Sequence, residues 1–418
     1  MLDRRAFTAA MGAGALVLSG CARRVEPLRV WAMGVEGEAL GRFAQAYQAE
    51  NPGKAVRVQA LPWGAAHEKL LTAFAADDLP DVIALGNTWI AEFAALDALA
   101  PLDAHLTDSP LKTQAVFDAA RRATTVGGRA VAVPWYVDTR LLFYRPDLLK
   151  RAGFALPAVT LDEWAAQLKA VARLHSNGHS LLMPINEYEP LVAFCLQSGA
   201  PLLRDNATHG NFRDPAIRAA FARVAGLYWN GYAQVLTSTE VPDLYSGFAR
   251  GDYGFVVSGP WNLGEFARRM PKDVEWATAT LPGPSGPGAS LSGGVSLCIP
   301  ARSKAQDDAF AFIEYLCAAP QQAMLHTIAG DLPADRAAWA AAGLDGDPRS
   351  LAFFRQLELA VSPPQAPEWE RIANEMAAAL ERVVRHIQPL DAALKGLDEF
   401  AELALAKRRS MVQQKGAA

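Results

Sequence analysis

The sequence predicts an α/β protein whose first sheet contains parallel strands covered by helices. Short runs rich in Val, Leu, Ile and Trp stand at 28–33, 55–61 and 81–85, and a segment with helical periodicity separates each run from the next. The order strand, helix, strand, helix, strand is typical of a parallel sheet with helices packed on its faces.

The first predicted helix occupies 37–53, where Leu40, Phe43 and Tyr47 fall on one face and an Asn-Pro-Gly sequence ends the pattern. A second helix is expected over 67–80. Ligands of such sheets bind beyond the carboxyl ends of the strands. We therefore expect a binding site near the three segments that follow the strands, which are 34–37, 62–64 and 86–89.

The middle of the chain continues the α/β pattern. Two strand-like runs with an aromatic and acidic centre lie in 129–153, and Thr160 with Glu163 forms a capping box that opens a helix. A buried strand in 252–261 ends at a Gly-Pro turn. The Pro/Gly/Ser-rich segment 282–294 is the clearest predicted linker. A strand, a helix and two terminal amphipathic helices follow it.

Composition limits the function classes. The 418 residues suggest two or three domains, or two lobes that share one site, and a hydrophobic fraction of 51% is sufficient for a full core. A net charge of −4 argues against nucleic acid as a partner. Cys195, Cys298 and Cys317 stand in apolar stretches, which favours buried thiols, although a bridge between the last two stays open.

The amino terminus has the pattern of an export signal. Arg4 and Arg5 precede an uncharged run over 6–20, small residues end this run, and Cys21 follows them. A run of about 15 residues is too short for a membrane span of about 20. The alternative is a short buried helix in which Cys21 is only a small apolar residue.

The stretch Leu-Ser-Gly-Cys that ends at Cys21 resembles the lipobox of bacterial lipoproteins. In that family the signal is cut before the cysteine, which is then acylated, so the resemblance implies lipidation at Cys21 and anchoring to a membrane. The paired arginines resemble a twin-arginine signal, and a Sec signal remains the alternative. We expect an exported, periplasmic and lipid-anchored protein.

Several motifs, in their order along the chain, resemble the maltose-binding type of extracellular solute-binding protein, the receptor of ABC sugar importers. They are "LRVWAMGVEG", "PDVIALGNTW", "AVPWYVDTRLLFYRPDLLKRAGF", "TLDEW", "GFARGDYGFVVSGPW" and "LSGGVSLCIP" followed by "AFIEYL". The resemblance implies a periplasmic-binding-protein-like α/β fold with two lobes, a multi-segment hinge and a ligand cleft between the lobes.

The resemblance also implies domain boundaries. These are a signal peptide at 1–20, a lipid-anchored linker at 21–27, a first lobe at 28–136 and 290–335, a second lobe at 137–289 and 336–412, and a tail at 413–418. The first crossing between the lobes would lie at Tyr136–Thr139.

A sugar site needs aromatic rings for the C–H faces of the sugar, and donors and acceptors for its hydroxyls. Aligned with the family, the ligand-binding candidates are Glu36, Trp63, Asn87, Thr88, Trp89, Tyr136, Asp138, Glu187, Tyr188, Trp261, Gly293, Gly294 and Trp369. Trp261 is the expected stacking platform, Asp138 the expected hydroxyl acceptor, and the two glycines would let backbone amides approach the sugar.

Each candidate also has a structural alternative. Trp261 would pack in the core, Asn87 and Thr88 would cap the next helix, and Glu36 would be a solvated loop charge. Asp138 would only tie the hinge, Trp63 would pack between the lobes, and the glycines would form a turn. The register of Trp369 relative to the family is open.

The predicted function is capture of an oligosaccharide for an ABC importer, with an α-linked glucose disaccharide such as maltose or trehalose as the best candidate. The expected partners are the sugar, the permease subunits and the membrane, and we expect a monomer without cofactor or metal. The alternatives are an exported glycoside hydrolase that uses a carboxylate pair, and a binder of glycerol-phosphate or a sugar phosphate.

Overall fold

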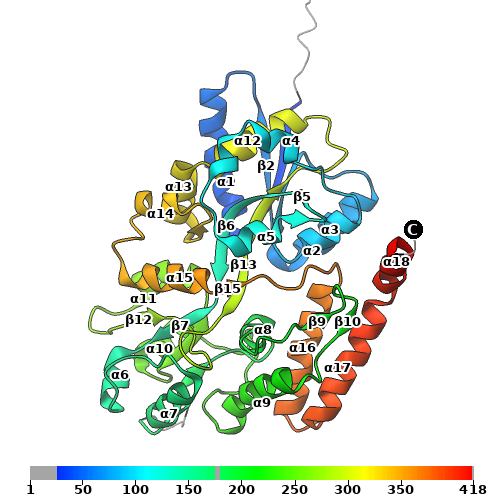
Figure 1. Ribbon diagram of the computed structural model, residues 1–418. Helices are drawn as coiled ribbons and strands as arrows, with labels where there is room; N and C mark the ends of the chain where they lie inside the picture. Colours follow the sequence, from blue (N-terminus) through cyan, green and yellow to red (C-terminus); the bar gives the residue numbers. More distant parts are fainter. Residues whose placement is uncertain (1–25, 175–178, 417–418) are drawn as a thin grey trace, which may run out of the picture.

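The computed structural model describes residues 26–174 and 179–416. It has two α/β lobes, one above the other in Figure 1, each built on its own sheet. The sheet of the first lobe has the strand order β14-β6-β13-β3-β1-β2, with β15 paired to β13. Its strands are β1 (Leu28–Met33), β2 (Val56–Leu61), β3 (Val82–Gly86), β6 (Val133–Thr139), β13 (Ser290–Cys298), β14 (Leu332–Pro333) and β15 (Ala360–Val361).

The first sheet is mixed, which corrects the expectation of a purely parallel one. β1 pairs in parallel with β2 and with β3, as predicted. β13, however, runs antiparallel to β3 and β6. The reason is the path of the chain, because it leaves the first lobe along β6 and returns along the adjacent β13.

The sheet of the second lobe has the order β12-β7-β11-β8. Its strands are β7 (Leu141–Tyr144), β8 (Leu181–Leu182), β11 (Phe255–Ser258) and β12 (Ala277–Ala279). Two short hairpins lie outside both sheets: β4 (Thr125–Val126) with β5 (Arg129–Ala130), and β9 (Leu203–Arg204) with β10 (His209–Gly210).

Most helices of the first lobe pack around its sheet. They are α1 (Gly34–Glu50), α2 (Trp63–Ala75), α3 (Ile90–Ala95), α4 (Asp103–Thr107), the 3-10 helix η1 (Pro110–Thr113), α5 (Asp118–Ala123), α12 (Gln306–Cys317) and α13 (Ala319–Ala329). The predicted apolar face of α1 is buried, since Leu40, Phe43 and Tyr47 are each at most 6% exposed. Burial of a large apolar side chain stabilises the fold by about 1.5–3 kcal/mol, so tertiary packing holds this helix in place.

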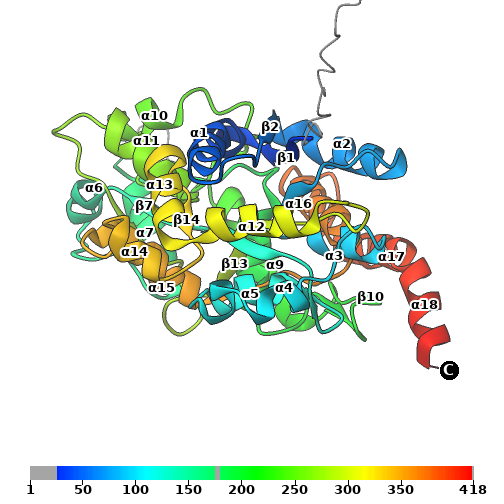
Figure 2. The same ribbon diagram turned by 90° about the horizontal axis from the view of Figure 1, so that it is seen from above.

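The helices of the second lobe lie around its smaller sheet, except α18, which extends from the end of α17 (Figure 2). They are α6 (Pro146–Arg151), α7 (Leu161–Ala172), α8 (Tyr188–Leu196), α9 (Pro215–Trp229), α10 (Leu244–Arg250), α11 (Trp261–Arg269), α16 (Trp369–Val384), α17 (Leu390–Ala404) and α18 (Ala406–Gly416). The predicted capping box opens α7, where the Thr160 hydroxyl accepts the Glu163 N–H and the Glu163 carboxylate accepts the Thr160 N–H.

The two lobes are joined by β6, by β13 and by the segment after β15. β6 and β13 each continue as one strand from the first lobe toward the second (Figure 1). The predicted lobe boundary at 136/137 therefore falls within β6, and the one at 289/290 falls at the start of β13. The lobe boundaries stay a prediction. The predicted linker 282–294 is only partly a loop, because residues from Ser290 onward belong to β13. Pairing with β6 and β3 overrides the flexible composition of this stretch.

A separate hydrophobic cluster lies where the lobes meet. It includes Phe117 and Leu332 of the first lobe, Phe143 of the second sheet, Val137 of β6 and Phe353 of α15 (Pro348–Glu358). The short helix α14 (Ala337–Ala341) packs beside it through its own Trp339. This side of the contact between the lobes is therefore packed with apolar side chains.

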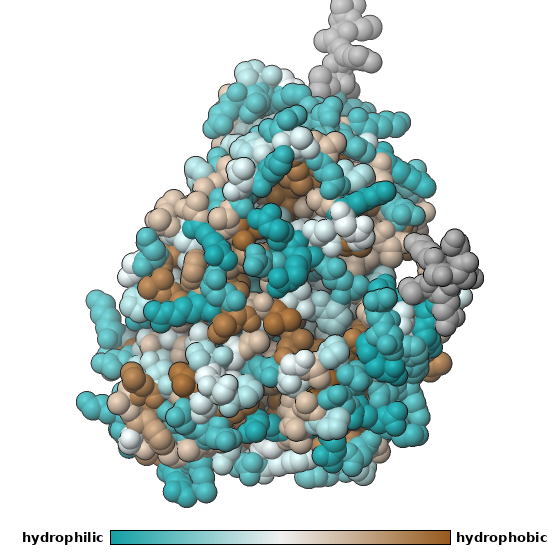
Figure 3. Space-filling model, viewed as in Figure 1, coloured by the Kyte–Doolittle hydropathy of each residue, from teal (hydrophilic) through white to brown (hydrophobic). Residues whose placement is uncertain are grey.

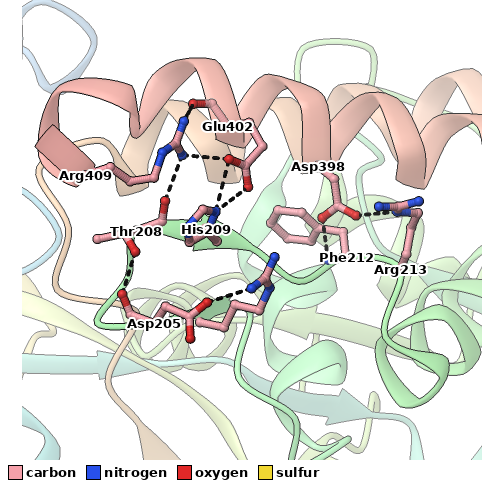
Figure 4. Close-up of polar contacts among 9 residues, drawn as sticks. Asp205, Thr208, His209, Phe212, Arg213, Asp398, Glu402 and Arg409 are labelled. Carbon is pink, nitrogen blue, oxygen red and sulfur yellow. Dashed lines mark hydrogen bonds and ion pairs between the residues drawn. The ribbon is translucent and has the colours of Figure 1, made fainter. Parts of the chain in front are cut away.

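The carboxyl-terminal helices are fastened to the second lobe by ion pairs (Figure 4). Glu402 of α17 accepts from His209 at 2.9 Å and pairs with Arg409 at 2.7 Å. Asp398, one turn earlier, accepts the Phe212 N–H and pairs with Arg213, each at 2.8 Å. Figures 1 and 2 both show α18 extending beyond the body of the lobe.

The three described cysteines are buried free thiols, so the structure does not contain the Cys298–Cys317 bridge that the sequence left open. Burial raises the pKa of the Cys195 thiol to about 12.

Within 26–174 and 179–416, no helix combines the length and the hydrophobicity that a membrane span requires. Hydrophilic residues cover most of the face shown in Figure 3, and hydrophobic residues form small separate patches. Cys21 lies outside the described residues.

Candidate functional site

A cavity of about 210 Å³ lies between the lobes, on the side where the strand ends of the first sheet face the second lobe. Side chains and backbone from both lobes line it: Trp63, Gly86, Asn87, Thr88, Trp89, Asp138, Arg140, Tyr188, Glu189, Leu291, Ser292, Gly293, Gly294 and Glu370. The structure therefore gathers eight of the thirteen sequence-predicted residues around one cavity.

Two tryptophans form the aromatic wall of the first lobe. Trp63 is the first residue of α2 and Trp89 follows β3, and their ring centroids lie 5.7 Å apart in an edge-to-face arrangement. Trp89 is 8% exposed and Trp63 is 41% exposed. Trp89 thus supports Trp63, and Trp63 offers the free aromatic surface.

Asn87 holds the cavity wall together. Its backbone N–H donates to the Gly294 carbonyl at 3.0 Å, its side-chain amide donates to the Gly293 carbonyl at 3.0 Å, and its side-chain oxygen accepts from Ser296 at 2.7 Å. These bonds clamp the end of β3 to β13. Asn87 is not the N-cap of α3, a position that Trp89 occupies.

Gly293 and Gly294 are required by the close approach of β6 to β13. A Cβ at Gly293 would lie 3.0 Å from the Asp138 carboxylate, and a Cβ at Gly294 would lie 2.3 Å from the Tyr136 carbonyl oxygen. Gly294 also has φ +107, a conformation that glycine adopts readily. The two glycines lie within strand β13 and not in a turn, and their backbone lines the cavity.

The second lobe contributes a carboxylate that a tyrosine hydroxyl binds. Glu370, in the first turn of α16, accepts from the Tyr188 hydroxyl at 3.1 and 3.2 Å. Burial raises the pKa of Glu370, and the hydroxyls of Thr88 and Tyr188 partly oppose this effect. Thr88, which follows β3 in the first lobe, and Glu370 of the second lobe both line the cavity.

Arg140 is the charged centre of the site. It is 8% exposed, its two terminal nitrogens donate to Asp138 at 2.6 Å and to Glu189 at 2.9 Å, and its guanidinium lies 4.6 Å from the centre of the Trp261 ring. Burial raises the pKa of Asp138, although the guanidinium opposes this shift. Burial alone would lower the pKa of Arg140, and the surrounding carboxylates more than offset it.

Trp261 and Glu187 line a second, more open hollow of about 380 Å³ on the second lobe. Trp261 begins α11, and its ring folds against Gly259, where a Cβ would clash with the ring. Trp261 is 40% exposed, so it is not a core residue. In the described part of the chain no donor contacts the Glu187 carboxylate, and burial raises its pKa.

Glu36 and Tyr136 lie beside the cavity rather than in its wall. Tyr136 donates to Glu36 at 3.3 Å, and a Cβ at Gly34 would meet both the Glu36 carboxylate and the Trp63 indole nitrogen at 2.7 Å. Asp331 is 5% exposed and interacts with Glu36. Burial raises the pKa of Asp331 well above its ordinary value, and the adjacent Glu36 carboxylate adds to this shift.

Trp369 does not line the cavity. Its side chain is 0% exposed and packs in the core of the second lobe. The reason is helical geometry, because Trp369 opens α16 on the face that packs inward, and Glu370, one position later, points to the cavity instead.

Three important residues were missed by the sequence reasoning: Arg140, Glu189 and Glu370. Arg140 stands two positions after Asp138, and the period of two of an extended chain was a signal that both side chains share one side. Glu189 and Glu370 each follow a residue that was chosen, within the first turn of a helix.

A larger hollow of about 560 Å³ lies at the opposite end of the first lobe, near the starts of β1 and β2. We assign the function to the smaller cavity, because ligands of α/β sheets bind beyond the carboxyl ends of strands. Among the residues described, no cluster of three or more His, Cys, Asp or Glu is arranged to hold a metal ion.

Two α/β lobes that share one cavity with an aromatic wall and several carboxylates define a two-lobed binding protein for a polar organic ligand. The chain belongs to the bacterial extracellular solute-binding protein family, whose profile matches residues 33–323. This confirms the predicted family and the two-lobed fold class. The family is extracellular, which agrees with the predicted export, and the lipid anchor stays a prediction.

Solved structures and a curated relative support this assignment. The sugar-binding protein MalE of Xanthomonas citri is 43% identical, with a TM-score of 0.88 over 93% of this chain and 99% of that one. The GacH receptor of Streptomyces glaucescens shares the fold at 22% identity, with a TM-score of 0.80 over 91% and 98% of the two chains. The diacetylchitobiose binding protein DasA of Streptomyces coelicolor is 25% identical over 392 residues, which are 90% of this chain and 89% of that protein.

Proposed function

We propose that this chain is the substrate-binding lipoprotein of an ABC carbohydrate importer. It captures an oligosaccharide between its lobes and presents it, chemically unchanged, to the permease subunits. The best candidate ligand is an α-linked glucose disaccharide such as maltose or trehalose. The 43% identity to a sugar-binding protein supports the ligand class.

The observation that carries the proposal is the mixture of groups in one cavity. Trp63 presents an exposed indole, on which the C–H face of a sugar can stack. Asp138, Glu189 and Glu370 offer carboxylate oxygens to hydroxyl donors, and Gly293 brings backbone within reach. A sugar presents both kinds of surface at once, which an apolar or purely ionic ligand does not.

The division of these groups between lobes gives the mechanism of capture. Trp63 belongs to the first lobe, Glu189 and Glu370 belong to the second, and Asp138 lies on the crossing strand β6. A ligand makes all its contacts only when the lobes are close, so it stabilises the closed arrangement. Hinge rotation would take place near Val137–Thr139. The importer can then distinguish loaded from empty protein by the spacing of the lobes.

Calorimetric titration with maltose and trehalose tests the ligand class, with the β-linked disaccharide cellobiose as comparison. We expect saturable binding of an α-linked disaccharide, complete recovery of the sugar, and a smaller radius of gyration in small-angle scattering at saturation. Cleaved sugar would instead identify a glycoside hydrolase. Binding with an unchanged radius of gyration would contradict capture by lobe closure.

A further inference from the structure

The cavity contains more carboxylates than cationic side chains. Among the described residues that line it, Arg140 is the one Lys or Arg, and the same lining contains the carboxylates of Asp138, Glu189 and Glu370. An arginine is the preferred partner of phosphate and carboxylate ligands, because its planar fork binds two oxygens at once. Whether Arg140 is available for such a ligand therefore decides which saccharides the site accepts.

The fork of Arg140 is already occupied by the protein. One terminal nitrogen donates to Asp138 at 2.6 Å and the other to Glu189 at 2.9 Å, so the outer edge of the guanidinium spans two carboxylates. Its Nε is buried and has no hydrogen-bond partner, so the second edge is closed to solvent. The Trp261 ring covers a face of the same group at 4.6 Å.

The other groups around the cavity add negative charge. Glu370 also lines the cavity, and it accepts from the neutral Tyr188 hydroxyl. His67, whose ring lies 5.0 Å from that of Trp89, is bound to Glu92 at 2.6 Å. A ligand anion in this cavity would therefore face carboxylates, with no unpaired Lys or Arg among the described lining residues, and like-charge juxtaposition of this kind weakens binding strongly.

We propose that Asp138 and Glu189 are specificity-determining residues, which exclude phosphorylated and carboxylated saccharides by occupying Arg140. The inference rests on the proposed function, since it concerns which saccharides the same site takes. Arg140 then acts as a positioning residue that neutralises two carboxylates and orients them toward the hydroxyls of an uncharged sugar. Removal of the two carboxylate charges would release its fork to an anionic ligand.

The test is a gain of binding in Asp138→Asn/Glu189→Gln. Affinities for trehalose and trehalose 6-phosphate, and for maltose and maltose 6-phosphate, are measured by calorimetry in the wild-type protein and in the variant. We expect wild-type protein to bind each phosphate at least about 100-fold more weakly than the neutral sugar. In the double variant the ratio of the affinity for the neutral sugar to that for its phosphate should fall by about tenfold or more, because the freed guanidinium pairs with the phosphate.

The matched control is Asp162→Asn/Glu381→Gln, which removes the same two charges from exposed pairs with Arg223 and Arg385. It should leave the ratio unchanged, which separates a local effect from a change in net charge. Where the double variant melts too early to titrate, Glu189→Gln alone supplies the same comparison.

Two results would overturn the proposal: a wild-type protein that binds a sugar phosphate as tightly as the neutral sugar, or a folded variant whose ratio does not change. Failure of both neutral disaccharides to bind wild-type protein is a different result. It would contradict the disaccharide assignment made under the proposed function. If the wild-type protein bound a sugar phosphate but neither neutral disaccharide, the proposed exclusion of anionic saccharides would be wrong.

Discussion

The guanidinium of Arg140 lies over the ring of Trp261, 4.6 Å from the ring centre. The same arginine bridges Asp138 and Glu189, so one side chain links the crossing strand β6 to two helices of the second lobe. The predicted stacking platform is therefore held in place by the charged centre of the site, and part of its surface is already covered. Three predictions rest on contacts of the described residues, and a fourth rests on the predicted lipobox.

Trp261→Ala should weaken sugar binding at least several-fold, because aromatic stacking contributes about 0.5–1.5 kcal/mol beyond area burial. Trp229→Ala is the matched control. Trp229 is the last residue of α9, is also exposed, at 45%, and stacks on the ring of His386. Calorimetric affinities and melting temperatures of both variants are compared. Normal binding by a Trp261→Ala protein that melts early would assign this ring to structure alone.

Trp369→Ala should mainly destabilise the fold, by about 3–5 kcal/mol, as expected for a fully buried tryptophan. Trp63→Ala should have the opposite profile, with a smaller loss of stability and a larger loss of affinity, because its ring is 41% exposed at the cavity. Denaturant unfolding and calorimetry measure the two effects. Equal losses of stability in both variants would contradict the division between core and wall.

Asp331→Asn should stabilise the protein near neutral pH. Burial raises the pKa of Asp331 well above its ordinary value, so the folded protein holds a proton that the unfolded chain loses above about pH 4. Stability contributed by this group therefore falls as pH rises from that value toward the folded-state pKa. The variant lacks this titration, and its melting temperature should fall less steeply over this range.

Asp335→Asn is the control for Asp331→Asn. Asp335 is equally buried, at 5% exposed, but its carboxylate accepts the Ala337 backbone N–H at 3.0 Å. This variant should lose stability. A different result would contradict this prediction: Asp331→Asn protein that is also less stable at neutral pH and whose stability depends on pH as steeply as that of the wild type. The Asp331 carboxylate would then have a hydrogen-bond donor that stabilises its charged form.

Cys21→Ser should release the protein from the membrane without altering its sugar affinity. The predicted lipobox ends at Cys21, and two or more acyl chains are needed for stable anchoring. Membrane fractionation and mass spectrometry of the mature amino terminus measure this. A membrane-bound variant that keeps residues 1–20 would show that the apolar run is not a cleaved lipoprotein signal.

The local elements of this protein were predictable because their signals are local. Alternating strand and helix patterns placed β1, β2 and β3 to within one residue, and the Thr160–Glu163 capping box is present as predicted. The helix α1 exists as predicted, but it begins at Gly34 directly after β1 and ends at Glu50, three residues earlier than expected at each end. Residues at strand ends, such as Trp63 and Asn87, were found because the topology of a parallel sheet brings those ends together.

Contacts between distant segments were not predictable, because they depend on how the lobes pack. Nothing near Arg140 in sequence shows that Glu189 would accept its hydrogen bond, or that Trp261 would lie over its guanidinium. The antiparallel pairing of β13 with β6 and the burial of Trp369 in the core of the second lobe also depend on how distant segments pack. The sequence by itself determined the element order, the class of protein and the strand-end site residues, since periodicity and motif order are properties of the chain. Only the tertiary structure decided which carboxylates Arg140 neutralises, because burial and charge pairing arise when separate segments meet.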